Sequence, residues 1–193
     1  MGGFEPHKNL LRLVDGFAEA LRNPRTSTAR LVLAGRFDTA SAQGYVAELR
    51  AKIDQCGLAS RTKWEGFIGD EELASLMRGA EVLILPSIRE GVGLPVIEAV
   101  ACGTPVIVTN ASPVAARLGE AAISIDPNDT SQIARALEEV LGNPATRAKM
   151  RGAALALSAS LGWKRSAQAI LQIFQEEFML LAASRRRQGG ARN

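Results

Sequence analysis

The chain has 193 residues, of which 47% are hydrophobic and 22% charged, a composition that indicates one globular domain able to bury a core. The net charge is +3, but the last ten residues carry four arginines and no acid, so the rest is nearly neutral and a nucleic-acid-binding protein is not indicated. The two cysteines and the single histidine fit no metal or redox spacing, and no apolar run approaches the ~20 residues that cross a bilayer. Because the first residues also lack a signal-peptide pattern, we expect a cytoplasmic protein with reduced thiols.

Helices and strands are predicted in alternation over the first half of the chain. Met1–Pro6 is turn-like, and an apolar stripe then predicts a helix from about His7 to Leu21. That stripe consists of Leu10, Leu11, Val14, Phe17, Ala18 and Leu21. The elements that follow are a strand over Arg30–Gly35, a helix over about Ser41–Gln55 with Tyr45, Val46, Leu49 and Ile53 facing the core, a strand over Thr62–Glu65, and a helix capped by Asp70 that runs through Met77.

The second half continues the alternation and ends in helices. A strand over Val82–Leu85 precedes a glycine loop, and a helix after that loop ends at Gly103. Residues Ala111–Leu118 are predicted as a loop or a short helix. The remaining elements are strands over Thr104–Thr109 and Ala121–Ile125, and helices over about Thr130–Leu141, Ala145–Ser160 and Trp163–Ala183.

This alternation predicts an α/β fold, a Rossmann-like doubly wound parallel sheet with helices on both faces. We expect one domain over residues 1–183 and a basic, disordered tail over residues 184–193. No strand precedes Gly2 and Gly3, although a glycine turn that opens a helix in such a fold normally follows a strand. We therefore expect that a preceding segment is missing or lies on another chain.

The stretch from Glu90 to Glu98 carries the clearest functional signal. It joins a strand to a helix through Gly91 and Gly93, with Pro95 fitting the first helical position. A glycine loop at a helix N-terminus offers free backbone amides and a positive dipole end to an anion such as phosphate. Two carboxylates beside that site need hydroxyl partners, so the stretch indicates a ligand with both phosphate and sugar.

A series of motifs, in order and at consistent spacing, resembles the group 1 glycosyltransferases, which form the retaining glycosyltransferase family 4. The resemblance covers roughly residues 1–180. The motifs are Gly2-Gly3-x-x-Pro6-x-Lys8-Asn9-Leu10, Trp64-x-Gly66-Phe67-Ile68-x-x-x-Glu72-Leu73, Pro86-Ser87-x-x-Glu90-Gly91-x-Gly93-Leu94-Pro95-x-x-Glu98-Ala99 and Cys102-Gly103-Thr104-Pro105-Val106.

The resemblance implies the C-terminal, donor-binding half of a GT-B fold, whose active site lies in a cleft between two Rossmann-like halves. It implies that Lys8 and Glu90 are the catalytic residues, with Lys8 on the donor diphosphate and Glu90 facing the donor sugar. The other implied donor-binding residues are Gly3, Phe67 and Ile68 near the base and phosphates, Gly91, Val92, Gly93 and Leu94 through their amides, and Glu98 on the ribose hydroxyls.

The resemblance further implies a metal-independent transfer that needs no cofactor beyond the nucleotide sugar. Many members carry an arginine near Gly3, and the glycine here is also found among mannosyltransferase-like members. GDP-mannose is therefore slightly favoured as donor, with a UDP-sugar next. The acceptor belongs to the N-terminal half, which we expect to be missing from this chain.

Alternatives remain open for most of these residues. The less favoured interpretations are that Glu90 and Glu98 are solvated acids and that Lys8 is a surface lysine. Phe67 is as well explained by core packing as by contact with the base, and Arg36 and Arg89 are either solvated or on phosphate. Trp64 and Trp163 are expected to pack and His7 to lie at the surface.

Two alternatives concern the whole chain. It is also compatible with a non-enzymatic module that binds a sugar nucleotide or a protein, and less well with another GT-B enzyme such as a sugar phosphorylase or an epimerase. The arginine-rich tail allows a peripheral contact with anionic lipid at the inner membrane, although a solvated tail is favoured.

Overall fold

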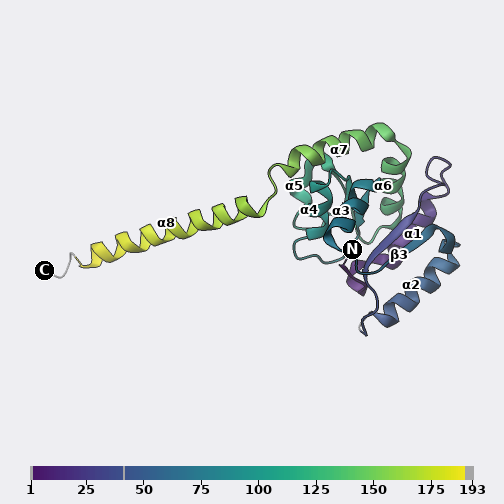
Figure 1. Ribbon diagram of the computed structural model, residues 1–193, viewed down its shortest axis with the longest axis horizontal. Helices are drawn as coiled ribbons and strands as arrows, with labels where there is room; N and C mark the ends of the chain where they lie inside the picture. Colours follow the sequence, from purple (N-terminus) through teal and green to yellow (C-terminus); the bar gives the residue numbers. More distant parts are fainter. Residues whose placement is uncertain (1, 41, 190–193) are drawn as a thin grey trace. The chain divides into compact units, whose positions relative to one another are not determined.

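The computed structural model describes residues 2–40 and 42–189, which form two compact units. The first unit ends at Ser158 and contains all the strands and the helices α1 to α7, and the second begins at Ala159 and contains α8 (Trp163–Gly189) (Figure 1). The predicted domain boundary at residue 183 lies within α8 and stays a prediction. Helical backbone continues to Gly189, and residues 190–193 of the predicted tail lie outside the described residues.

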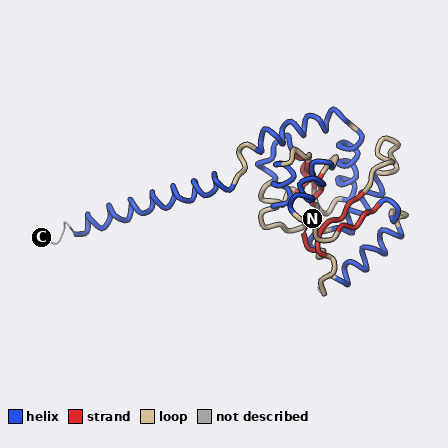
Figure 2. The backbone as a smooth tube through the Cα atoms, viewed as in Figure 1, coloured by secondary structure: helices blue, strands red, loops and turns tan. Residues whose placement is uncertain are grey.

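The strands form two parallel sheets of three strands each, drawn in red in Figure 2. The first sheet has the order β1-β2-β3 and the second the order β4-β5-β6. In β1, Gly2 faces Gly35 and Gly3 faces Arg36 of β2. The strands are β1 (Gly2–Gly3), β2 (Leu31–Arg36), β3 (Thr62–Glu65), β4 (Leu83–Leu85), β5 (Val106–Thr109) and β6 (Ala122–Ile125). The five predicted strands are thus observed within two residues at each end, whereas Gly2 and Gly3, which were predicted to lie in a turn, form β1.

The helices connect and cover these strands. They are η1 (Pro6–Lys8), α1 (Leu10–Ala20), α2 (Gln43–Gln55), η2 (Ala59–Arg61), α3 (Asp70–Gly79), α4 (Leu94–Ala101), α5 (Ala115–Leu118), η3 (Gly119–Ala121), α6 (Thr130–Gly142) and α7 (Pro144–Ser158), where η marks a 3-10 helix. The four predicted core residues of α2 are all buried. Among the described residues, no helix has the length and apolar character that crossing a bilayer requires.

The structure corrects three of the local predictions. The first helix does not start at His7, because Asn9 takes a left-handed conformation with φ 59° and separates η1 from α1. Asp70 does not cap α3, since Gly69 is the N-cap and Asp70 is the first helical residue. Trp163 does not pack in the core, because it is 82% exposed.

The core lies between the sheets and the helices of the first unit. In β5 all four residues are buried, as expected for a strand of a parallel sheet covered on both faces. Helix α1 packs against α6 at Gly16, where an added Cβ would lie only 2.6 Å from a side-chain carbon of Ile133. Leu13 and Ala20 of α1 are buried although they lie outside the predicted stripe. Of that stripe, Val14 and Phe17 are buried and the other four residues are partly buried against the core.

Candidate functional site

The loops that follow β1 and β4 lie side by side at the carboxyl ends of their strands. The amide of Ile88 donates a hydrogen bond of 2.8 Å to the carbonyl of His7, which joins the two loops directly. In the first sheet the chain proceeds from β1 to β3, and in the second it proceeds from β4 to β6. The direction in which strands are added therefore reverses between β1 and β4. Doubly wound folds bind their ligands at such a switch point.

Asn9 anchors the first of these loops, and the sequence interpretation gave it no role. Its buried side-chain amide donates to the carbonyl of Pro86 at 3.0 Å and to that of Pro127 at 2.7 Å. Its amide oxygen accepts a hydrogen bond of 2.9 Å from Arg12. Asn9 thus ties η1 to the ends of β4 and β6, and its left-handed backbone turns the chain so that Lys8 faces the second loop. The Asn at position 9 could have indicated a break in the predicted helix, because Asn tolerates the left-handed backbone conformation better than most residues do.

Lys8 and Glu90, the two predicted catalytic residues, form an ion pair across these loops. Nζ of Lys8 lies 3.0 Å from Oε2 of Glu90, and the two side chains are only 16% and 15% exposed. Burial by itself would raise the pKa of Glu90, but the hydrogen bond and charge of Lys8, with the Ser87 hydroxyl and the Gly91 amide, hold that pKa below its ordinary value. Glu90 is therefore an ionised acceptor at neutral pH.

The predicted glycine loop runs directly into the N-terminus of α4. Gly93 is the N-cap, is buried and has φ 79°, and a Cβ added there would lie 3.3 Å from Val114 and 3.5 Å from the hydroxyl of Ser112. Leu94 is the first helical residue, so Pro95 occupies the second position rather than the predicted first. The missing N–H of proline still costs nothing there, because the first turn has no intrahelical acceptor for it.

Glu98 lies on α4, one helical turn beyond Leu94, and is exposed. Its carboxylate makes no hydrogen bond or ion pair with other side chains in the described part of the chain. Val92 and Leu94, at the start of the same helix, are 56% and 46% exposed. The structure thus places Glu98 and the loop amides on one accessible element and Glu90 just before it.

Phe67 and Ile68 follow β3 at the same carboxyl edge of the first sheet. Phe67 is 76% exposed, so its alternative assignment to the core is wrong. The guanidinium of Arg36, at the end of β2, lies 5.1 Å from the centre of the Phe67 ring. Arg89 is exposed, and His7 lies 3.5 Å from Glu5 at the surface, as expected.

An aromatic cluster supports this edge, and only Trp64 of its members had been expected to pack. The rings of Phe4 and Trp64 stack with centres 5.7 Å apart, and Phe37 meets both edge-on. Arg50 covers the Trp64 ring at 4.2 Å. Because Phe4 follows β1, Phe37 follows β2 and Trp64 lies in β3, the cluster fixes the three strand ends relative to one another. It holds Gly3, which is exposed at the end of β1, next to η1 and Lys8.

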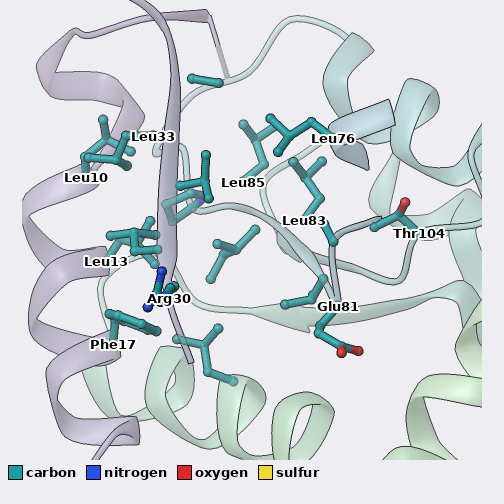
Figure 3. Close-up of a pocket in the computed structure, with 18 of the residues that line it drawn as sticks. Leu10, Leu13, Phe17, Arg30, Leu33, Leu76, Glu81, Leu83, Leu85 and Thr104 are labelled. Atoms are coloured by element: carbon teal, nitrogen blue, oxygen red, sulfur yellow. The ribbon is translucent and has the colours of Figure 1, made fainter. Parts of the chain in front are cut away.

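The described residues contain no group of three or more His, Cys, Asp and Glu side chains placed to hold a metal ion. A cavity of about 350 Å³ opens beside Gly3, Lys8 and Pro86 and extends between β2 and β4 (Figure 3). Its walls are mostly aliphatic, so it differs in character from the polar loops around Glu90.

Comparison with known proteins identifies relatives of this chain. The model of the family described as glycosyl transferases group 1 matches residues 1–156. A D-inositol 3-phosphate glycosyltransferase from Paenarthrobacter aurescens is 35% identical over 136 residues, which are 69% of this chain and 33% of that protein. An O-antigen chain mannosyltransferase B from Escherichia coli is 28% identical over 167 residues, which are 85% of this chain and 42% of that protein. The chain thus spans between a third and less than half of the length of these relatives.

Solved structures agree with the fold. Sucrose-phosphate synthase from Thermosynechococcus elongatus superposes with a TM-score of 0.81 at 25% identity, covering 93% of this chain and 45% of that chain. The Anabaena protein HepE in complex with UDP superposes with a TM-score of 0.79 at 24% identity, covering 91% of this chain and 48% of that chain. The C-terminal domain of the group 1 glycosyl transferase LpcC from Francisella tularensis superposes with a TM-score of 0.75 at 24% identity. The match covers 83% of this chain and 82% of that chain.

These superpositions confirm the predicted Rossmann-like fold of a GT-B glycosyltransferase half. Because the family model matches residues 1–156 of the 193, the chain belongs to the group 1 glycosyl transferases.

Proposed function

We propose that this chain binds the nucleotide-sugar donor of a retaining glycosyltransferase, and that the acceptor domain lies outside it. The observation that carries this proposal is the Lys8–Glu90 pair, held at the switch point directly before the N-terminus of α4. A cation, a carboxylate and open helix amides are the groups that a sugar diphosphate needs within one site.

The chemistry of glycosyl transfer suits these groups. When the bond between sugar and diphosphate breaks, negative charge develops on the diphosphate and the sugar gains oxocarbenium character. In this proposal the ammonium of Lys8 and the amides of the Gly91–Leu94 loop stabilise the leaving diphosphate. In this proposal the diphosphate draws Lys8 away from Glu90, whose carboxylate then orients the sugar hydroxyls and supports the developing cation.

The remaining predicted residues take the rest of the donor. Glu98 is an exposed carboxylate on α4 that has no side-chain partner among the described residues, so it is suited to accept hydrogen bonds from the two ribose hydroxyls. Phe67 offers an exposed aromatic face and Ile68 an adjacent backbone for the base. Because Gly3 has no side chain, nothing at that position keeps the donor phosphates from Lys8. We propose no metal and no further cofactor in this transfer.

The identity of the donor base and sugar is also part of this proposal. GDP-mannose is slightly favoured by Gly2 and Gly3, and the mannosyltransferase among the relatives supports it. A UDP-sugar is next, in line with the UDP bound to HepE. A contact of the arginine-rich tail with an anionic membrane remains a further proposal, since the side chains of residues 181–193 lie outside the described part of the structure.

Calorimetry of this chain with GDP, UDP and ADP tests the ribose assignment. We expect weak binding of at least one nucleotide and a loss of about tenfold in affinity for Glu98→Ala, because two hydrogen bonds to a carboxylate are removed. Glu139→Ala is the matched control, since Glu139 is also exposed on a helix but lies on α6. Unaltered binding by Glu98→Ala would contradict the assignment, and no response to any of the three nucleotides would favour the non-enzymatic alternative.

A further inference from the structure

The carboxyl ends of β1, β2 and β3 place three residues in one row across the first sheet. Gly3 of β1 lies opposite Arg36 of β2 in the parallel ladder. The pairing of β2 with β3 continues past the end of β3, where the amide of Gly35 donates a hydrogen bond of 3.3 Å to the carbonyl of Gly66. The next step of this register places Arg36 opposite Phe67. Because opposite residues of neighbouring strands point to the same face of a sheet, Gly3, Arg36 and Phe67, here called the edge row, share one face.

The edge row faces away from the core. Gly3 and Arg36 are exposed, and Phe67 is 76% exposed. Successive residues of a strand alternate between the two faces, so Phe4 and Phe37, which follow Gly3 and Arg36, belong to the opposite face. There the two rings meet with centres 5.7 Å apart in the aromatic cluster described above. The cluster thus fixes the strand ends from one side and leaves the edge row open on the other.

Arg36 contacts the ring of Phe67, its neighbour in the edge row. The guanidinium carbon lies 5.1 Å from the ring centre. No acidic side chain in the described part of the chain forms an ion pair with Arg36. An exposed cation–π contact is weak, so a flat aromatic ligand can replace the guanidinium on the ring. The displaced guanidinium then offers a rigid fork of N–H donors to the same ligand.

The edge row begins beside the proposed phosphate site and leads away from it. The loop after β1 carries Lys8, and the carbonyl of His7 in that loop is bonded to the loop that precedes α4. From β1 the row passes through β2 to β3. Neighbouring strands lie about 4.8 Å apart, so Phe67 stands about 10 Å from Gly3 along the row. Because the ribose separates the base from the phosphates in a nucleoside diphosphate, a diphosphate at Lys8 leaves the base free to reach the far end of the row.

We propose that Arg36 determines which base the donor site accepts, and that this base is guanine. In this arrangement the base packs against the ring of Phe67, and the displaced guanidinium donates two hydrogen bonds to O6 and N7 at the edge of the base. A guanidinium fork matches these two neighbouring acceptors. The inference rests on the proposed function and deepens it, because it names the nucleotide that the same site binds.

Other bases do not offer this pair of acceptors. Adenine carries an amino group where guanine has O6, so one donor of Arg36 meets another donor. Uracil has a carbonyl but no N7 beside it, so one of the two hydrogen bonds is lost. Lysine in place of Arg36 keeps the charge but lacks the fork. Base selectivity therefore separates this role from a general attraction between Arg36 and the diphosphate.

Calorimetry with GDP, IDP, ADP and UDP tests the proposal, because IDP keeps O6 and N7 of guanine and lacks its 2-amino group. We expect the wild-type chain to bind GDP and IDP about tenfold more tightly than ADP, with UDP also weaker than GDP. Arg36→Met and Arg36→Lys should each bring the ratio of the GDP and ADP affinities close to one. Arg50→Met is the matched control, since Arg50 is also exposed and covers an aromatic ring, at 4.2 Å from the centre of Trp64. This control should keep the wild-type ratio.

An equal loss of affinity for all four nucleotides in Arg36→Met would overturn the proposal, because Arg36 would then act on the diphosphate. IDP that binds as weakly as ADP would also overturn it, since the preference would then depend on the 2-amino group. A wild-type chain that binds nucleotides without preferring guanine contradicts this inference alone and leaves the proposed function standing. A wild-type chain that binds none of the four contradicts both. Circular dichroism checks the fold of each variant, and if Arg36→Met does not fold, the ratio in Arg36→Lys decides.

Discussion

Lys8 and Glu90 lie 82 positions apart in the chain, and each is oriented by its own neighbours. Asn9, the neighbour of Lys8 in the chain, is fixed by hydrogen bonds from its side-chain amide to two carbonyls, and the Ser87 hydroxyl and the Gly91 amide help to lower the pKa of Glu90. The sequence placed both residues in one site through the motif resemblance. The sequence did not predict their direct contact. Residue patterns indicate local helix and strand periodicity, but they contain no information on the distance between two loops.

Lowering the pH should remove the contribution of this pair to stability. The pKa of Glu90 lies below its ordinary value of 4.5 in the folded state, so its contribution is fully present above about pH 5 and is lost as the pH falls through the lowered pKa. We expect the difference in unfolding free energy between the wild type and Glu90→Gln to be about 0.5–1 kcal/mol at neutral pH. Urea titrations at a series of pH values measure it.

That difference should shrink towards zero between about pH 5 and about pH 3, because protonated Glu90 resembles Gln. Glu139→Gln, on the exposed face of α6, is the control and should change little at any pH. A difference for Glu90→Gln that grows on acidification would show that the ionised carboxylate destabilises the fold, contrary to the ion pair seen here.

At the scale of elements, the loop between β4 and α4 is the part that the sequence predicted best. Its glycines, its helix and its position after a strand are all observed, and only Pro95 is shifted by one residue. The break at Asn9 and the aromatic cluster of Phe4, Phe37 and Trp64 were not predicted. Both depend on contacts between strand ends, which the period of a single element does not encode.

The two loop glycines should respond differently to a methyl group. Gly93 has φ 79° and close neighbours, whereas Gly91 has no atom within 4 Å of an added Cβ and no left-handed φ. We expect Gly93→Ala to lower the unfolding free energy by about 1–2 kcal/mol, because alanine is strained in that conformation. Gly91→Ala should change it by less than about 0.5 kcal/mol. Chemical denaturation of both variants measures the contrast, and an equal cost at the two positions would contradict the assigned loop geometry.

At the scale of the molecule, strands and helices alternate as predicted, and the first unit has the Rossmann-like fold that the alternation required. The residue patterns predicted this because each helix carries an apolar stripe and each buried strand is a short apolar run. The exposure of Trp163 at the start of α8 could not be predicted in that way. The spacing of apolar residues along a helix is the same whether or not another element packs against them. The chain spans 33% and 42% of the length of the two curated relatives described above.

The proposed function requires that a donor diphosphate binds at the N-terminus of α4, against Lys8. The most direct measurement is a titration of the isotope-labelled chain with GDP and with UDP, followed by amide NMR spectra. We expect the largest chemical-shift changes at Gly91, Val92, Gly93 and Leu94, with a further change at Lys8, because these groups meet the phosphates. Saturable changes confined to other parts of the fold, with this loop and Lys8 unaffected, would contradict it.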